Sequence, residues 1–300
     1  MTRKYLIPAL ICTFFWGLSY PLVKLGSRLF IPDGRIPELM IFAGVRFLLS
    51  GGIIVSGCFI RHRKHPDMPA LPAPRTLPKV IILSLLLTFF HYTLMYAGLS
   101  NCDGSKSSVL KQAGIIGVIL FSGIFYKDDK LTFRKLIGCL IGFSGIIVCN
   151  LPFSGGFRLM GEGFILLASV SSSAGDMYSK HAASGNDPIL LSGWQQLIGG
   201  LILFLTGMLA GGKITAVSSN VIIVLMALVV SSIIAYTLWL CLSKKYGVSE
   251  LALIKLTIPI FGIITSAALL GERLFTWQNW AAVLLVSLGV IIAENKRCWK

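Results

Sequence analysis

Residues 214–243 are ITAVSSNVIIVLMALVVSSIIAYTLWLCLS, an apolar stretch of 30 residues without one charged side chain. A helix of about 20 residues crosses the hydrocarbon core of a bilayer, so this stretch is long enough to span a membrane. Five other uncharged stretches have a similar length, namely residues 5–23, 80–102, 136–157, 188–212 and 274–293. Four further apolar segments are shorter or carry an isolated charge: residues 39–60, 107–126, 163–179 and 251–271. We therefore predict an all-α polytopic membrane protein with ten transmembrane helices.

Composition and charge agree with a membrane protein and argue against a nucleic-acid partner. Only 13% of the residues are charged, whereas about 25% is typical of globular chains. If the N-terminus is placed inside, 17 of the 27 Lys and Arg residues fall on the inner side and 7 on the outer side. The remaining three, Arg46, Lys111 and Lys255, lie within the membrane. By the positive-inside rule we expect a multi-pass protein of a bacterial inner membrane with both termini cytoplasmic.

The sequence contains no pattern typical of a metal site, a cofactor or an enzyme. The seven cysteines form no C-x-x-C pair, and Walker, H-E-x-x-H and G-x-S-x-G motifs are missing. We therefore predict no cofactor, no metal and no catalytic activity. The basic segment 61–65 precedes a proline-rich stretch, which we interpret as a plain cytoplasmic linker or as a contact for anionic lipid headgroups.

An internal repeat divides the chain into two halves. Shifted by 144 residues, Tyr92-Thr93-Leu94 falls on Tyr236-Thr237-Leu238, Lys111 on Lys255 and Gly145 on Gly289. We predict a first half at residues 1–157 with helices 1–5, and a second half at 158–300 with helices 6–10. Five crossings per half force the two halves to run in opposite directions through the membrane. This is an inverted-topology repeat, which many secondary transporters use.

Several motifs resemble the EamA-type members of the drug/metabolite transporter superfamily. They are Trp16-Gly17-Leu18-Ser19-Tyr20-Pro21, Arg46-Phe47, Pro259-Ile260-Phe261-Gly262, Leu270-Gly271-Glu272-Arg273-Leu274, and the segment from Ala282 to Gly289. The first half departs from the second-half signature, with Ala113-Gly114 near the expected proline and Lys127-Asp128-Asp129 for the usual Gly-Glu. The resemblance implies a carrier of amino acids or other metabolites. In more distant relatives that carry sugar phosphates, basic residues on helices 4 and 9 contact the phosphate.

The intramembrane cations are the first candidates for a substrate site. A charge at bilayer depth costs roughly 2.5–3.5 kcal/mol, so it normally faces the interior of the bundle. Lys111 and Lys255 would flank the midplane, where each either binds an anionic group of a substrate or extends toward the interface. Arg46 is either part of the cavity wall or a clamp on neighbouring carbonyls, and the clamp is favoured because Arg makes rigid multidentate contacts.

Two titratable residues are candidates for proton coupling. Asp176 lies four residues before Lys180, a spacing that suits an ion pair along one helix, and we favour that pairing over a coupling role. His91 lies in the middle of helix 3. It is either a hydrogen-bonded packing residue or a proton carrier.

Aromatic and amide side chains complete the predicted cavity wall. A mostly apolar wall with a few polar groups is typical of small-molecule sites, although many such aromatics serve only packing. The candidates are Trp16, Tyr20, Tyr92, Tyr96, Gln112, Trp194, Gln195, Tyr236 and Trp239. Pro21 and Pro259 are expected to break or kink helices 1 and 9, and the freed carbonyls would lie beside a cavity.

These observations favour a secondary transporter that exports a small amino-acid-like or anionic metabolite by alternating access. Three intramembrane cations against one acid disfavour cationic substrates. The alternative is a non-transporting lipid-binding or scaffold protein with the same fold. The expected partners are a small metabolite and anionic lipids at the cytoplasmic face, and the sequence allows a monomer or a homodimer.

Overall fold

The computed structural model describes residues 5–30, 35–99, 101, 104–149, 157–214, 218–271 and 277–294, and in these ranges it contains helices and loops but no strand. This confirms the all-α prediction. The helices up to residue 149 are α1 (Leu6–Phe30), α2 (Ile36–Lys64), α3 (Leu77–Leu83), the π-helix η1 (Ser84–Phe90), α4 (His91–Leu99), α5 (Gly104–Phe125) and α6 (Phe133–Cys149). Those that follow are the π-helix η2 (Leu159–Gly163), α7 (Phe164–Ala183), α8 (Pro188–Leu209), α9 (Ser219–Ser243), α10 (Val248–Ile254), the 3-10 turn η3 (Lys255–Thr257), α11 (Ile258–Leu270) and α12 (Trp277–Glu294).

The described helices have the length and surface of membrane spans. Six are long and apolar enough to cross a bilayer: Leu6–Gly26, Ile36–Lys64, Leu77–Leu99, Pro188–Leu209, Ser219–Ser243 and Val248–Leu270. Two shorter apolar helices cover Leu110–Phe125 and Trp277–Ala293. Large apolar side chains such as Ile124 and Leu209 are exposed on the outside of the bundle, where lipid would cover them. The chain is therefore a polytopic membrane protein.

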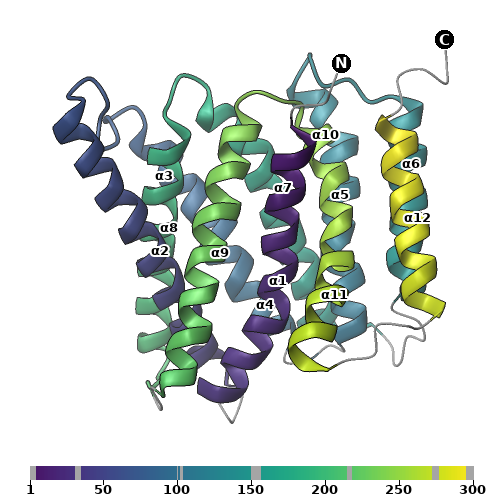
Figure 1. The fold of residues 1–300 in the computed structure, drawn as a ribbon, viewed down its shortest axis with the longest axis horizontal. Coiled ribbons are helices and arrows are strands. Elements are labelled where there is room, and N and C mark those ends of the chain that lie inside the picture. The colour runs from purple at the N-terminus through teal and green to yellow at the C-terminus, as the bar shows by residue number, and fades with distance from the viewer. Residues whose placement is uncertain are drawn as a thin grey trace.

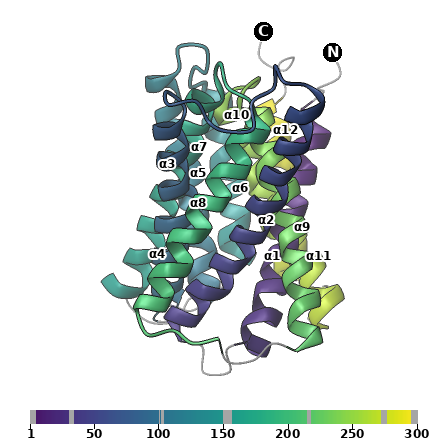
Figure 2. The same ribbon diagram turned by 90° about the vertical axis from the view of Figure 1, so that its left-hand side faces the viewer.

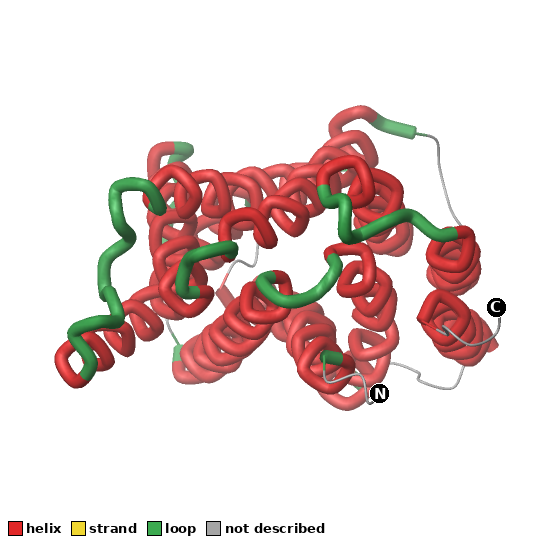
Figure 3. The backbone as a smooth tube through the Cα atoms, turned by 90° about the horizontal axis from the view of Figure 1, so that it is seen from above, coloured by secondary structure: helices red, strands yellow, loops and turns green. Residues whose placement is uncertain are grey.

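The helices form one bundle and lie roughly along a common direction (Figures 1 and 2). Seen along that direction, they appear end-on (Figure 3). Helix α2 packs along α8, α6 packs along α12, and α1 contacts both α9 and α11. We call the end at which α1 begins and α12 ends the upper end, as it is drawn in Figure 1. The lower end is where α1 ends and α2 begins.

Glycines permit the closest of these helix contacts. A Cβ atom on Gly51 of α2 would lie 2.3 Å from the backbone nitrogen of Leu197 in α8. A Cβ on Gly138 of α6 would lie 2.4 Å from the carbonyl oxygen of Gly289 in α12. Small residues at helix interfaces let the backbones approach, which is a main source of association inside a bilayer. These contacts hold the helices that frame the centre of the bundle.

Pro21 lies inside α1 and the helix continues through it. Because proline has no N–H, the carbonyl of Gly17, four residues earlier, loses its helical partner. The Thr265 hydroxyl of α11 lies 3.5 Å from that oxygen but donates to the Phe261 carbonyl of its own helix at 2.8 Å. A Cβ on Gly17 would lie 2.6 Å from the Cβ of Phe261, so α1 and α11 are packed closely here. The carbonyl that Pro21 leaves without its helical donor is therefore covered by the close packing of α11.

Candidate functional site

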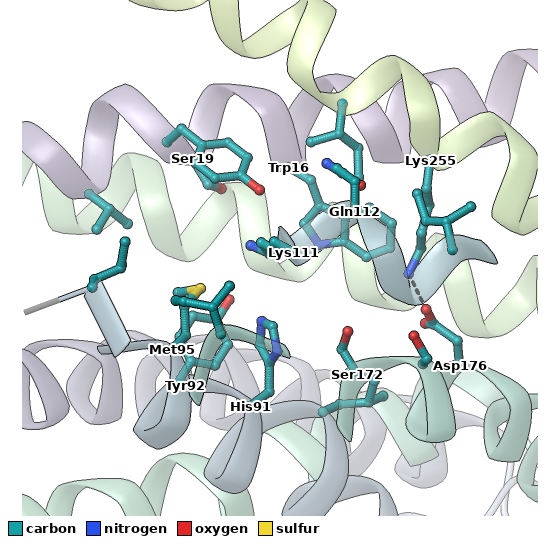
Figure 4. A pocket seen from close by; sticks show the side chains of 18 of the residues that line it. Trp16, Ser19, His91, Tyr92, Met95, Lys111, Gln112, Ser172, Asp176 and Lys255 are labelled. Carbon is teal, nitrogen blue, oxygen red and sulfur yellow. Dashed lines mark hydrogen bonds and ion pairs between the residues drawn. The ribbon is translucent and has the colours of Figure 1, made fainter. Parts of the chain in front are cut away.

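A cavity of about 560 Å³ lies in the bundle, bordered by residues of α1, α2, η1, α4, α5, α7, α9, α10, η3 and α11. It extends from Asp176 and Lys255 down to Lys24, Leu39 and Leu99 near the lower end. Among the described residues, its charged lining consists of Lys24, Arg46, Lys111, Lys255 and the single acid Asp176. Figure 4 shows Lys111, His91 and the Lys255–Asp176 pair around this space. The lining therefore carries an excess of positive charge.

Lys255 lies where the helix formed by residues 248–270 is interrupted. The missing N–H of Pro259 leaves the Lys255 carbonyl without its usual helical donor. A 3-10 bond from the N–H of Ile258 takes its place. The expected break in helix 9 is thus present, as a single 3-10 turn that carries Lys255 at its start.

The ammonium of Lys255 is enclosed by protein groups. Its Nζ lies 2.6 Å from Oδ2 of Asp176, and both side chains are largely buried. The same Nζ lies 4.5 Å from the ring centroid of Trp16 and 4.1 Å from that of Trp239. Such cation–π contacts add about 0.5–2 kcal/mol, most where the cation is desolvated. Lys255 therefore has a counter-ion and an aromatic enclosure of its own.

The expected pair between Asp176 and Lys180 is wrong. Asp176 is buried and binds Lys255, whereas the Nζ of Lys180 lies 2.6 Å from Oδ2 of Asp128 in the loop after α5. The spacing of four residues along α7 would also allow Asp176 to pair with Lys180. Asp176 faces the cavity, however, and a buried carboxylate is stabilised by a buried cation more than by one at the interface. Helix packing therefore determines that Asp176 pairs with Lys255.

Lys111 lies on α5 and has a different environment. Its Nζ lies 4.7 Å from the ring centroid of Tyr20. In the described part of the chain no carboxylate forms an ion pair with it. The next residue, Gln112, also lines the cavity, and its side-chain amide has no hydrogen-bond partner among the described residues. Lys111 is therefore a cation in the cavity that no described acid neutralises.

Arg46 links three helices at the edge of the cavity. Its Nε donates to the Ser232 hydroxyl at 2.7 Å, and its Nη2 donates to the Ser19 hydroxyl at 3.3 Å. Its guanidinium carbon lies 5.1 Å from the ring centroid of Phe47. The multidentate arrangement matches the expected clamp, but the partners are hydroxyls of α1 and α9 where carbonyls were expected.

His91 begins α4 directly after the π-helix η1 and is buried. Its Nδ1 lies 2.9 Å from the carbonyl oxygen of Ala168 in α7. Its ring also packs edge-on against Tyr92. The packing interpretation therefore has a structural basis, while the ring still lines the cavity.

The predicted aromatic residues divide into two groups. Trp16, Tyr20, Tyr92, Tyr96, Tyr236 and Trp239 line the cavity. The hydroxyls of Tyr92 and Tyr236 lie 3.2 Å apart, and the buried indole N–H of Trp239 has no partner among the described residues. These side chains provide both apolar surface and hydrogen-bonding groups.

Trp194 and Gln195 lie outside the cavity lining, which corrects their expected place in the wall. The indole N–H of Trp194 donates to the Ala70 carbonyl in the loop after α2, at 2.9 Å. The amide of Gln195 is fully buried and donates to the Thr88 hydroxyl at 2.6 Å. Both belong to α8, which packs against α2, α3 and η1, so their side chains tie helices together on that side of the bundle.

Sequence reasoning missed some residues of the site. Ser172 and Ser173 of α7 and Met95 of α4 line the cavity. The run of three serines at 171–173 inside an apolar helix was the available signal. A buried acid, Glu38, was also missed; it pairs with Arg35 at the start of α2 and does not line the cavity.

Polar contacts join helix ends above the cavity, at the upper end of the bundle. Asp129 is buried; one oxygen accepts from Nζ of Lys135 at 2.8 Å and the other from the backbone N–H of Ser249 at 2.7 Å. Burial works to raise the pKa of Asp129, but the hydrogen bonds from Lys135 and Ser249 outweigh it and lower the pKa. The hydrogen bond from Lys180 likewise lowers the pKa of the exposed Asp128. Tyr126 donates to the Met177 carbonyl at 2.6 Å.

Known proteins resemble this chain over nearly its whole length. The profile of the EamA-like transporter family matches residues 3–151 and again residues 159–294. A protein of Escherichia coli named "Probable amino-acid metabolite efflux pump" is 26% identical over 96% of this chain and 94% of its own length. An uncharacterised transporter of Archaeoglobus fulgidus is 25% identical over 98% of this chain and its own full length.

A solved crystal structure has the same fold. It matches with a TM-score of 0.81 at 16% sequence identity, covering 98% of this chain and 97% of the other. At that identity the likeness concerns the fold alone. The family profile, in contrast, covers most of the chain and confirms the resemblance found in the sequence motifs. The chain belongs to the EamA-like transporter family.

Proposed function

We propose that this protein is a secondary carrier of a bacterial inner membrane that exports a small amino-acid-like or anionic metabolite by alternating access. In this proposal ten helices span the bilayer as two inverted halves, residues 1–157 and 158–300, and both termini are cytoplasmic. The upper end of the bundle is then the cytoplasmic end. The positive-inside distribution of Lys and Arg supports that orientation.

Three observations support the inverted repeat. The family profile matches the chain twice, once in each proposed half. Tyr92 and Tyr236 are equivalent at the 144-residue offset, and their hydroxyls touch, as residues on a two-fold axis would. The same offset places Gly138 on Ala282 and Gly145 on Gly289. The contact of Gly138 with Gly289 is therefore equivalent to that of Gly145 with Ala282, and both join α6 to α12.

The charge of the cavity carries the proposed substrate class. Of the described residues, four cations and one acid line it, and that acid is bound to Lys255. Lys111 is left without an acidic partner among the described residues, so an anionic group on the solute would neutralise it. The Escherichia coli relative is named as an efflux pump of amino-acid metabolites, which agrees with a carboxylate as that group.

The shape of the cavity supports alternating access. It extends toward the lower end of the bundle, whereas contacts of Asp128, Asp129 and Tyr126 join helix ends at the upper end. In the proposed orientation this is a conformation open to the outside. Export requires a second conformation in which the upper contacts separate and the lower ends of α1, α2 and α4 approach. An inverted repeat provides two such conformations, since each half can adopt the arrangement of the other.

The test is transport by purified protein in liposomes. A screen of metabolites by thermal shift in detergent identifies solutes that bind, and counterflow of a radiolabelled hit then measures transport. We expect Lys111→Ala to weaken both by roughly 10- to 100-fold, while Lys64→Ala, at an exposed position on α2, leaves both unchanged. Transport that Lys111→Ala leaves unchanged contradicts the site. If the protein binds anionic lipid vesicles and moves no solute, the result supports the alternative of a non-transporting lipid-binding or scaffold protein.

A further inference from the structure

We infer that the cavity recognises a carboxylate together with a neighbouring hydrogen-bond donor, and that the Nε2 atom of His91 accepts from that donor. The substrate class is then an α-amino acid or an α-hydroxy acid. This inference rests on the proposed function and deepens it, because it adds a second recognition point to Lys111. It also assigns His91 a specificity role beyond packing.

The hydrogen bond to Ala168 determines which nitrogen of His91 carries the proton. A carbonyl oxygen can only accept, so the Nδ1 atom that lies 2.9 Å from it must be the donor. In a neutral imidazole the other nitrogen, Nε2, then has a free lone pair. A charged imidazolium would add a positive charge to a cavity whose described lining has four cations and one acid. The surroundings therefore favour the neutral ring.

The Nε2 lone pair has no partner in the described part of the chain. Among the described residues, the one hydrogen bond of the His91 side chain is that of Nδ1, and 5% of the residue's surface is exposed, toward the cavity that it lines. Figure 4 shows the ring of His91 directed into the same space as the ammonium of Lys111. His91 also follows the π-helix η1 directly, and such π segments are frequent at functional sites. The hydrogen bond from Nδ1 to the Ala168 carbonyl thus holds the Nε2 acceptor toward the solute.

The groups opposite His91 can donate hydrogen bonds to a carboxylate. Lys111 provides an ammonium that no described acid neutralises, and the next side chain is the amide of Gln112, which has no hydrogen-bond partner among the described residues. The hydroxyl of Ser172, near His91 in the lining, already donates to the Ser169 carbonyl at 3.2 Å. A carboxylate therefore prefers the Lys111 side, and an ammonium or hydroxyl proton prefers the His91 side.

The Lys255 side offers no equivalent place for the carboxylate. Asp176 neutralises that ammonium at 2.6 Å, and Trp16 and Trp239 cover it. A solute carboxylate there would have to displace Asp176 and leave an acid buried without its partner. The asymmetry between the two lysines therefore fixes the orientation of the solute.

A matched set of compounds tests the inference on the wild-type protein. For each of three skeletons, those of alanine, leucine and phenylalanine, four compounds are compared by thermal shift and by counterflow. They are the amino acid, its 2-hydroxy analogue, the acid without either donor, and the amine without the carboxylate. We expect the first two to bind about 10- to 100-fold more tightly than the last two in at least one skeleton, because each of the others leaves one buried group unpaired.

Substitutions of His91 sharpen the test. In His91→Asn the side-chain amide can still donate to Ala168 but the Nε2 acceptor is lost, so the preference for the amino acid over the donor-free acid should disappear. His91→Gln places an amide oxygen near the position of Nε2 and should keep part of the preference. The matched control is His62→Asn, because His62 also bonds a carbonyl through Nδ1, at 2.8 Å from Met68, but lies outside the cavity lining. It should behave as wild type.

The outcomes separate this inference from the proposed function. Binding that requires Lys111 but is equal for the amino acid and the donor-free acid overturns the inference and leaves the proposed function standing. Preference that persists in His91→Asn also overturns it. If no carboxylate of the panel binds, or if binding ignores Lys111, both proposals fail.

Discussion

Lys111 and Lys255 are equivalent at the 144-residue offset, yet their surroundings differ in one decisive respect. Lys255 has a carboxylate at 2.6 Å and two indole rings within 4.5 Å. Lys111 has the ring of Tyr20 at 4.7 Å and no acid among the described residues. A paired cation contributes to the structure and a cation without an acid is available to a ligand. Near-identical positions in a repeated sequence can thus acquire separate roles through one neighbouring residue.

The largest effect is expected from removing the acid of the paired lysine. Asp176→Asn leaves the ammonium of Lys255 without a counter-ion in a largely buried position. Breaking one side of such a pair costs about 3–5 kcal/mol, so thermal unfolding in detergent should shift to clearly lower temperature. The double variant Asp176→Asn, Lys255→Met should recover most of that loss. A single variant as stable as wild type would show that the pair contributes nothing.

The opposite pattern is expected at Lys111. Lys111→Met removes a cation that no described acid neutralises, so the unfolding temperature should change little. Binding of a carboxylate solute should weaken by roughly 10- to 100-fold, because a charge-assisted hydrogen bond contributes about 1.5–3 kcal/mol. Calorimetric titration with the best compound of the panel, together with a melting curve, separates the two effects. Equal loss of stability in Lys111→Met and Asp176→Asn would remove the distinction between the two lysines.

An acid can also be added beside Lys111. Tyr20 lies against its ammonium and is 39% exposed, so Tyr20→Asp should fold. The new carboxylate would form an ion pair with Lys111, as Asp176 does with Lys255. Binding of a carboxylate solute should therefore weaken about tenfold. Tyr20→Asn is the control, because the Asn side chain has nearly the size of Asp but no charge. Competition binding measures both variants, and an equal effect of the two would attribute the loss to the missing ring.

The smallest effect concerns the upper contacts, which lie outside the cavity. The pKa of Asp129 is lowered in the folded state, so its contribution to stability is present above its unfolded pKa of about 3.9 and is lost as the pH falls through the folded pKa. Asp129→Asn should lower the stability by about 1–2 kcal/mol at pH 7 and reduce the acid dependence of unfolding. Melting curves from pH 7 to pH 3 check this. Unchanged acid dependence in the variant would show that other carboxylates control it.

Much of the architecture was predictable because its causes are local. Hydrophobic length gives the helices, and the missing N–H of Pro259 gives the turn at Lys255. Most predicted cavity residues, including Lys111, Gln112 and Tyr236, do line one cavity. The predictions for Trp194 and Gln195 failed because the sequence did not indicate which side of α8 faces the cavity. Which side faces the centre depends on neighbours that are distant in sequence.

The sequence by itself determined that this chain is a polytopic helical membrane protein of the EamA-like family, with three basic residues inside its apolar segments. Hydropathy and motif identity require only neighbouring residues, and both can be seen in the chain. Only the tertiary structure decided that Asp176 binds Lys255 and leaves Lys180 to Asp128. The spacing of four residues would allow Asp176 to pair with Lys180. The buried carboxylate pairs with Lys255, however, because helix packing brings that ammonium into the same desolvated space.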